Sequence, residues 1–107
     1  MQKNIAIYHM AIDPKRKSCI NLQLDILKHY AKEHDWNVVK IYYDNSNLES
    51  EKKELDRLIQ DSANNEFDLV LIKTGYYISR RTSQFLKIRQ KLKNNDVTLY
   101  SLVEGEI

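Results

Sequence analysis

Four short runs of β-forming residues alternate with three helical patterns along the chain, and this alternation restricts the fold more than any other feature. The runs are dense in Val, Ile, Leu and Tyr, and three of them lack the strict polar–apolar alternation of a strand with one wet face. They cover residues 5–8, 38–43, 67–72 and 97–103. We therefore expect strands that are covered on both faces.

The segments between these runs carry apolar residues at helical spacing. Each segment places its apolar side chains three or four positions apart, which predicts an amphipathic helix with one face against a core. The segments are residues 18–34, with Ile20, Leu24, Leu27 and Ala31, residues 49–63, with Leu55, Leu58, Ile59 and Ala63, and residues 80–95, with Phe85, Ile88 and Leu92.

The order β-α-β-α-β-α-β with short connections predicts an α/β fold. Right-handed crossovers then give three layers, with a largely parallel β-sheet of four or five strands and helices on both faces. A chain of 107 residues has the length of one domain, so we expect a single domain over residues 1–107. With 42% hydrophobic and 30% charged residues and only two glycines, the composition is that of an ordered protein.

The composition also narrows the classes of function. Cys19 is the single cysteine, so neither an internal disulfide nor a cysteine-rich metal site is expected, and a lone thiol fits the cytoplasm. No apolar run approaches the length of a membrane span, and no segment reads as a signal peptide. A net charge of +2 is too balanced to identify a nucleic-acid binder, so any basic surface must be local.

Sites for cofactors and metals are also not expected. Gly75 and Gly105 are too few for either common glycine-rich phosphate loop. His9, His29 and His34 have no carboxylate at ligand spacing, so we interpret them as surface histidines and predict no metal and no cofactor.

In a parallel sheet, ligands and active groups gather where the strands end. The predicted carboxyl ends are residues 9–17, 44–48, 73–79 and the segment from 104 onward. The densest basic run ends the first of these segments, at residues 15–17, and another basic pair, residues 80–81, directly follows the third. The candidate nucleic-acid-binding residues are Lys15, Arg16, Lys17, Arg80 and Arg81.

Two long stretches, "IAIYHMAIDPKRKSCINLQLDILKHYAKEHDWNVVKIYYDNS" and "FDLVLIKTGYYISRRTSQFLKIRQKLKNNDVTLYSLVEGEI", resemble the N-terminal catalytic domain of the serine recombinases, the resolvase/invertase family. The resemblance covers residues 3–107 and implies a resolvase-like fold. It also implies DNA cleavage by a serine hydroxyl, through a phosphoserine intermediate. Family members continue into a dimerisation helix and a helix-turn-helix domain, and we expect this chain to lack both.

The active-site motif of the first strand is altered. The family reads Y-x-R-V-S there; Tyr8 keeps the tyrosine, whereas Met10 stands at the arginine and Ile12 at the serine. Gln23 falls on a glutamine of the family in the following helix, which supports this register. The resemblance therefore implies that this chain is a degenerate member that lacks the nucleophile.

The cationic residues around that nucleophile are also reduced. Where the family reads approximately D-R-L-S-R after the third strand, Tyr76 and Tyr77 replace the first two residues, and Ser79 and Arg80 remain. Asp44 matches an aspartate of the family. The arginine expected before the second helix is at best Lys52 or Lys53, and a lysine cannot reproduce a planar guanidinium fork.

These substitutions predict a catalytically inactive domain, associated with DNA recombination or mobile elements, that acts through protein contacts. Covalent strand cleavage is not expected, because Ile12 offers no oxygen to phosphorus. An apolar surface around Met10 and Ile12 is a candidate contact region. The partners that the resemblance implies are a recombinase-family protein, a second copy of the chain, or DNA bound weakly and without sequence preference.

Two alternatives remain at this point. The first is a small DNA-binding accessory protein that uses the basic residues named above, with binding that weakens steeply in salt. The second is a recombinase domain that still cuts DNA through a relocated hydroxyl. The hydroxyl candidates are Ser18, Thr74 and Ser79, each of which more simply serves as a cap or a loop hydrogen-bonder.

Overall fold

The computed structural model describes residues 3–10, 17–44, 53–73 and 82–106. The predicted alternation of strands and helices is confirmed, and a short fifth strand follows it. The elements are β1 (Lys3–Met10), α1 (Lys17–Glu33), β2 (Trp36–Asp44), α2 (Lys53–Asp61), the 3-10 turn η2 (Ser62–Asn64), β3 (Leu69–Ile72), α3 (Thr82–Asn94), β4 (Thr98–Ser101) and β5 (Gly105–Glu106).

The five strands form one sheet in the order β2-β1-β3-β4-β5. β1 pairs in parallel with both β2 and β3, and β3 pairs in parallel with β4. β5 turns back and pairs antiparallel with β4, opposite Tyr100 and Ser101. The four parallel strands therefore end at one common edge of the sheet, here called the carboxyl edge, and the mixed sheet matches the predicted fold class.

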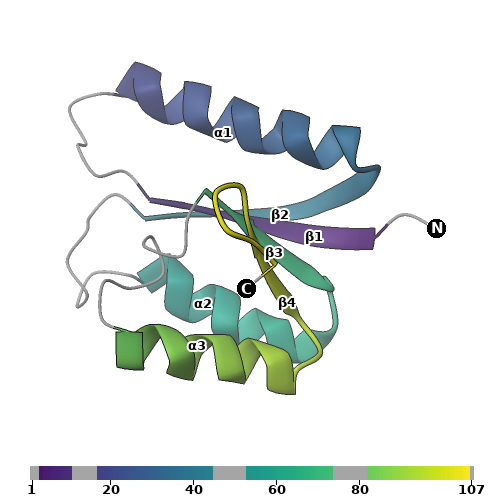
Figure 1. The fold of residues 1–107 in the computed structure, drawn as a ribbon, viewed down its shortest axis with the longest axis vertical. Helices are drawn as coiled ribbons and strands as arrows, with labels where there is room; N and C mark the ends of the chain where they lie inside the picture. The colour runs from purple at the N-terminus through teal and green to yellow at the C-terminus, as the bar shows by residue number, and fades with distance from the viewer. Residues whose placement is uncertain (1–2, 11–16, 45–52, 74–81, 107) are drawn as a thin grey trace.

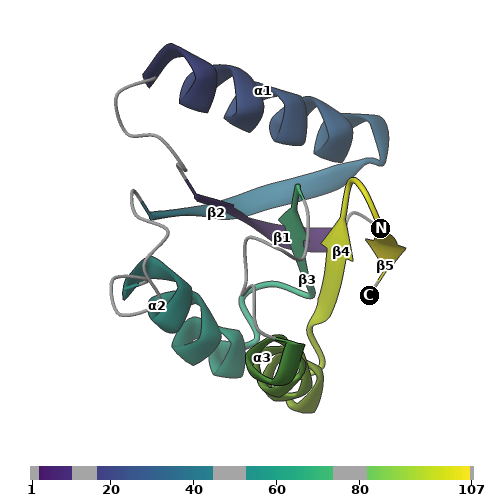
Figure 2. The same cartoon turned by 60° about the vertical axis from the view of Figure 1, so that its left-hand side comes forward.

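Helices cover both faces of this sheet (Figures 1 and 2). α1 lies along one face, and α2 and α3 lie side by side on the other. No helix within the described ranges is long and apolar enough to span a bilayer.

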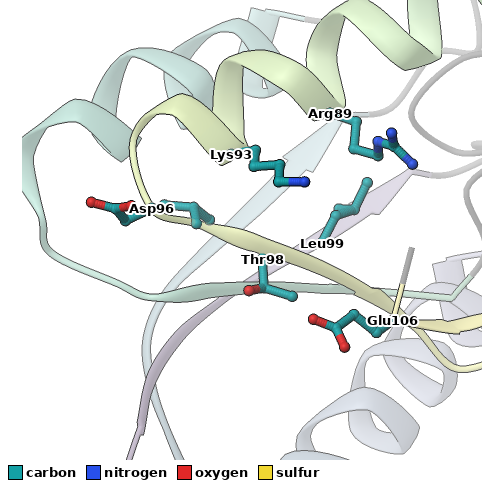
Figure 3. A pocket seen from close by; sticks show the side chains of 7 residues that line it. Arg89, Lys93, Asp96, Thr98, Leu99 and Glu106 are labelled. Atoms are coloured by element: carbon teal, nitrogen blue, oxygen red, sulfur yellow. The ribbon is translucent and has the colours of Figure 1, made fainter.

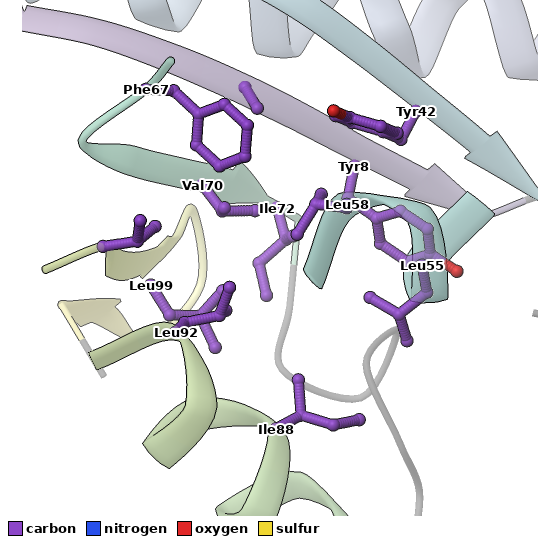
Figure 4. Packing of buried hydrophobic residues seen from close by; sticks show 12 residues of the cluster. Tyr8, Tyr42, Leu55, Leu58, Phe67, Val70, Ile72, Ile88, Leu92 and Leu99 are labelled. Carbon is purple, nitrogen blue, oxygen red and sulfur yellow. The ribbon is translucent and has the colours of Figure 1, made fainter. Parts of the chain in front are cut away.

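β1 is buried on both faces, because its side chains alternate between the two faces of the sheet and each face is covered by helices. Ile5 and Ile7 pack in the cluster under α1, with Leu27 of that helix. Ala6 and Tyr8 point the other way, into the cluster formed with α2 and α3. Figure 4 shows this second cluster, in which side chains of both helices close over the sheet. Its labelled members are Tyr8, Tyr42, Leu55, Leu58, Phe67, Val70, Ile72, Ile88, Leu92 and Leu99.

Three helix-to-strand turns use a residue in the left-handed region. Asp35, Asn65 and Asp96 have φ angles of 57°, 57° and 61°, and each follows a helical segment and precedes a strand. Asp and Asn are the residues other than glycine that adopt this conformation most readily. The sequence thus ends three helical segments without using a glycine.

β2 is an edge strand of the sheet, and its side chains are less buried than those of β1. The pairing of β1 with β2 shifts between Ile5 and Ala6, opposite Val38 and Lys40, so that Val39 is an extra residue in β2. Val39 and Ile41 are exposed. The prediction of strands covered on both faces is therefore correct for β1 and β3 and wrong for β2.

Candidate functional site

The carboxyl edge is where the sequence places the site residues, and the structure describes part of it. Tyr8 and Asp44 are fully described, and the backbones of Met10 and Lys17 lie in β1 and at the start of α1. The other predicted site residues lie outside the described residues. They are Ile12, Lys15, Arg16, Tyr76, Tyr77, Ser79, Arg80 and Arg81, together with the hydroxyl candidate Thr74.

Tyr8 and Asp44 are joined by a buried hydrogen bond. The Tyr8 hydroxyl donates to Oδ2 of Asp44 at 2.8 Å, although the two residues are 36 positions apart in the chain. Both side chains are buried, at 0% and 5% exposure. Tyr8 stands next to Tyr42 in the pairing of β1 with β2, and Asp44 stands opposite Met10 at the end of that pairing. The hydrogen bond therefore fixes the ends of the two strands against each other.

The same carboxylate caps α2. Oδ1 of Asp44 accepts a hydrogen bond from the backbone N–H of Glu54 at 3.0 Å, and Oδ2 accepts one from Leu55 at 3.1 Å. The first N–H groups of a helix have no partners within it, and a negative charge at that end interacts favourably with the helix dipole. Asp44 thus satisfies two of these donors and the Tyr8 hydroxyl at once.

This arrangement limits what Asp44 can do chemically. A carboxylate that is buried and accepts three hydrogen bonds has few oxygen lone pairs left to coordinate a metal ion or to contact a substrate. In the described structure, Tyr8 and Asp44 connect β1, β2 and α2. The hydrogen bonds of these two residues therefore serve the packing of the domain.

His9 lies at the same edge and is a buried polar residue, so the prediction of a surface histidine was wrong. It was expected at the surface, but it is 2% exposed, because it follows Ile5 and Ile7 on the α1 face of β1. Its ring stacks on that of Tyr43, with centroids 6.0 Å apart and planes at 29°. Side chains two positions apart in a strand point to the same face, so the position of His9 two residues after Ile7 was the signal that could have located it.

The surroundings of His9 favour its neutral form. Burial lowers the pKa of the imidazole below its ordinary value, and the positive charge of Lys73 lowers it further. Burial also raises the pKa of the neighbouring Tyr43 phenol. The described part of the carboxyl edge on the α1 face therefore holds uncharged aromatic rings.

The other two histidines are exposed, as predicted. Nε2 of His29 lies 2.9 Å from Oε1 of Glu33, one helical turn away. His34 stacks between Tyr30 and Trp36, with centroid distances of 4.2 and 4.7 Å. Within the described ranges, no group of three His, Cys, Asp or Glu side chains is placed to hold a metal ion.

Comparison with known proteins assigns the chain to a family. Residues 13–107 match the model of the resolvase N-terminal domain. The chain belongs to the resolvase N-terminal domain family. A comparison with curated protein sequences finds no significant match. The matched region begins at residue 13, so the match does not extend over Tyr8, Met10 and Ile12.

Solved structures of serine recombinases share the fold. The N-terminal catalytic domain of TP901-1 integrase is 29% identical, with a TM-score of 0.84, and the match covers 96% of this chain and 79% of that one. A resolvase-family site-specific recombinase from Streptococcus pneumoniae is 16% identical, with a TM-score of 0.83, and the match covers 97% and 74%. The C-terminal catalytic domain of ISC1926 TnpA, an IS607-like serine recombinase, is 22% identical, with a TM-score of 0.84, and the match covers 92% and 70%.

Proposed function

We propose that this chain is a resolvase-like domain that has lost DNA strand cleavage and acts through protein contacts in recombination or in the biology of mobile elements. The observation that carries the proposal is Ile12, which stands where the family has its nucleophilic serine. Met10, Tyr76 and Tyr77 replace an arginine, an aspartate and a second arginine of the family in the same alignment.

The chemistry of the family explains why these four replacements act together. Serine attack on a phosphodiester needs an oxygen that reaches phosphorus and fixed cations that stabilise charge growing on the phosphate oxygens. Ile12 removes the first requirement, and Met10 and Tyr77 remove guanidinium groups that serve the second. Losing a nucleophile alone costs roughly a million-fold in turnover in the well-studied serine proteases.

The described geometry supports the register on which this assignment rests. Tyr8 and Asp44 are the two residues matched to the family in the first two strands, and their side chains meet at 2.8 Å. The same geometry argues against these two groups as replacements for the missing serine. The Tyr8 hydroxyl is buried and donates to a carboxylate, so it has no route to a phosphodiester.

A cleavage assay tests the proposal. The purified chain is incubated with supercoiled plasmid and with a nicked duplex that traps covalent intermediates, beside an active serine recombinase catalytic domain as the positive control. We expect neither relaxed plasmid nor a protein–DNA adduct from this chain. A phosphoprotein–DNA adduct would refute the proposal, and loss of that adduct in Ser18→Ala, Thr74→Ala or Ser79→Ala would identify a relocated hydroxyl.

The protein-contact part of the proposal has a separate test. We expect the chain to form a complex with the catalytic domain of a recombinase from the same mobile element, or with a second copy of itself, in analytical ultracentrifugation. Met10→Glu and Ile12→Glu should weaken that complex, because each places a charge in the proposed apolar contact region. A monomer that binds no recombinase domain at any accessible concentration would contradict this part alone.

A further inference from the structure

Positive charge is concentrated on α3. The helix carries four basic residues and no acidic one over Thr82–Asn94, whereas the whole chain has a net charge of only +2. By contrast, α2 has Glu54 and Asp56 in its first turn and ends at Asp61. The basic residues of α3 are Lys87, Arg89, Lys91 and Lys93.

The core-facing side of α3 divides these residues into two pairs. Ile88 and Leu92 are buried against the sheet. Because neighbouring positions on a helix surface are three or four residues apart, Arg89 and Lys93 lie together on one flank, and Lys87 and Lys91 lie on the other. Arg89 is half-buried, and the other three are exposed.

The Arg89–Lys93 flank borders a cavity of about 580 Å³ between α3 and the last two strands. It is lined by Arg89, Lys93, Asp96, Val97, Thr98, Leu99 and Glu106. Figure 3 shows the Arg89 and Lys93 side chains extending from α3 over Leu99 and Thr98. The carboxylate of Asp96 points away from them at one end, and Glu106 lies beyond Thr98. A cavity of this volume falls within the size range of small-ligand sites.

The polar side chains that line this cavity form no ion pair and no hydrogen bond with one another. The ion pairs among the described residues involve His29, Lys40 and Arg57, so neither Arg89 nor Lys93 has a carboxylate within 4.0 Å in that part of the chain. Within the same ranges, the Thr98 hydroxyl takes part in no side-chain hydrogen bond. Two cations and one hydroxyl therefore face the cavity with their donors available.

We propose that the cavity between α3 and β4 is a phosphate-binding site in which Arg89, Lys93 and Thr98 are the ligand-binding residues. A guanidinium fork and an ammonium group on adjacent turns match the several oxygens of a tetrahedral phosphate, and the hydroxyl supplies a further donor. A carboxylate, with two oxygens in one plane, would use fewer of these donors. Lys87 and Lys91 add to the positive field around the site, so that the four basic residues of α3 outnumber the two rim carboxylates.

The phosphate can come from the backbone of a nucleic acid or from a small phosphate ester. The site is separate from the carboxyl edge, because Val97 and Thr98 lie at the amino end of β4. None of the predicted basic residues 15–17 and 80–81 is among its lining residues. The phosphate site does not depend on whether the domain cleaves DNA. The proposed site and the proposed loss of cleavage can therefore each be refuted without the other.

The experiment uses three double variants that each remove two positive charges. Arg89→Gln with Lys93→Gln removes the cavity pair, Lys87→Gln with Lys91→Gln removes the opposite flank of α3, and Lys28→Gln with Lys32→Gln removes an exposed pair on α1, across the sheet. Binding of a short DNA duplex, a single-stranded oligonucleotide, pyrophosphate and a poly-glutamate peptide is measured by fluorescence anisotropy or by chemical shifts of the backbone amides. Urea unfolding checks that each variant stays folded.

We expect the cavity pair to lose about tenfold or more in affinity at low salt, and the slope of log affinity against log salt to fall by about 2. The opposite flank should lose less, and the α1 pair less than about twofold. Pyrophosphate should shift the amides of Thr98 and Leu99 if small phosphate esters are the source, and only the nucleic acids should do so if a backbone is. Either pattern supports the site.

Three results would overturn it. Equal losses in all three variants would show that net charge, and not the cavity, determines binding. Poly-glutamate that binds as tightly as the phosphate probes would indicate a docking site for acidic peptides. Finally, no binding of any phosphate probe at low salt would show that the cavity does not hold this group.

Discussion

The Tyr8–Asp44 hydrogen bond is the clearest case of a single contact that organises the described carboxyl edge. Asp44 sits at the end of β2 and accepts hydrogen bonds from Tyr8, Glu54 and Leu55. A buried carboxylate is costly unless its oxygens have donors, so the three donors are needed together. Tyr8 and Asp44 thus form part of the structural framework that joins β1, β2 and α2.

Tyr8→Phe tests this role. The substitution keeps the ring and removes one donor from a buried carboxylate, so we expect the free energy of unfolding to fall by ~1–3 kcal/mol. Tyr100→Phe is the matched control, because its hydroxyl pairs at 2.8 Å with the neutral hydroxyl of Tyr30 in a partly buried position and should cost less. Urea denaturation gives both values. A Tyr8→Phe variant as stable as wild type would contradict the role.

His9 makes a prediction about pH. Its folded-state pKa lies below the ordinary value of 6.5, because burial and Lys73 disfavour the charged ring. The unfolded chain therefore takes up a proton at His9 at a higher pH than the folded chain does. Its contribution to stability is complete above about pH 6.5 and is lost as the pH falls below that value toward the folded pKa.

We expect His9→Gln to remove this part of the pH dependence of the free energy of unfolding between neutral and mildly acidic pH. His34→Gln serves as the control, because that ring is exposed and precedes the amino end of β2, at the opposite end of the strand from the carboxyl edge. The measurement is urea denaturation at a series of pH values. If wild type and His9→Gln show parallel pH profiles, burial of His9 does not govern its ionisation.

At the scale of elements, the turns that end the helical segments depend on single residues with positive φ. Asn65 follows η2 with φ 57° and ψ 28° and is exposed, so its conformation, rather than its contacts, explains its presence. For a residue with a Cβ other than Asn or Asp, this backbone conformation is unfavourable by roughly 1–2 kcal/mol, whereas glycine adopts it without that strain.

Asn65→Ala should therefore lower the free energy of unfolding by about 1 kcal/mol, and Asn65→Gly should leave it unchanged or raise it slightly. Asn64→Ala makes the same chemical change one residue earlier, inside η2, and is expected to have a much smaller effect. Thermal or urea unfolding distinguishes the three variants. Equal losses at positions 64 and 65 would contradict the conformational explanation.

Periodicity predicted the elements well and their surroundings less well. The apolar spacing located all three helices and four strands, because burial imposes a period of 3.6 or 2 on the residues themselves. It did not predict β5, which is two residues long, nor the exposed β2 edge, where Val39 is an extra residue in the pairing. Strand order and bulges depend on contacts between segments, and no local pattern records them.

The site was predicted in part, for a similar reason. The resemblance named Tyr8 and Asp44 as retained family residues, but the hydrogen bond between them was not predicted. The capping of α2 by Asp44 was not foreseen, since the sequence placed the start of that helix earlier, at residue 49. The Arg89–Lys93 cavity was also missed. It forms where α3 meets β4 and β5, three elements whose packing the sequence alone does not specify.

At the scale of the whole molecule, the proposed loss of cleavage involves several elements. The substituted positions lie at the end of β1 and in the sequence after β1 and β3, while Asp44 is the last residue of β2 and is hydrogen-bonded to the backbone of α2. Transition-state stabilisation needs the nucleophile and the cations in one fixed arrangement, and residues that act as a unit are strongly non-additive. Restoring one of them should therefore restore little.

Ile12→Ser alone is expected to give no covalent adduct with a nicked DNA duplex, because the hydroxyl would lack the arginines that stabilise charge on the phosphate. Adding Met10→Arg, Tyr76→Asp and Tyr77→Arg should produce a detectable protein–DNA adduct, and replacing the new serine by alanine should abolish it. Gel analysis of labelled DNA under denaturing conditions measures all three chains. If Ile12→Ser alone forms the adduct efficiently, cations already present elsewhere in the domain suffice, and loss of the hydroxyl alone explains the inactivity. If the fourfold variant stays inert while its free energy of unfolding matches wild type, the carboxyl edge differs from that of active recombinases by more than the four matched side chains.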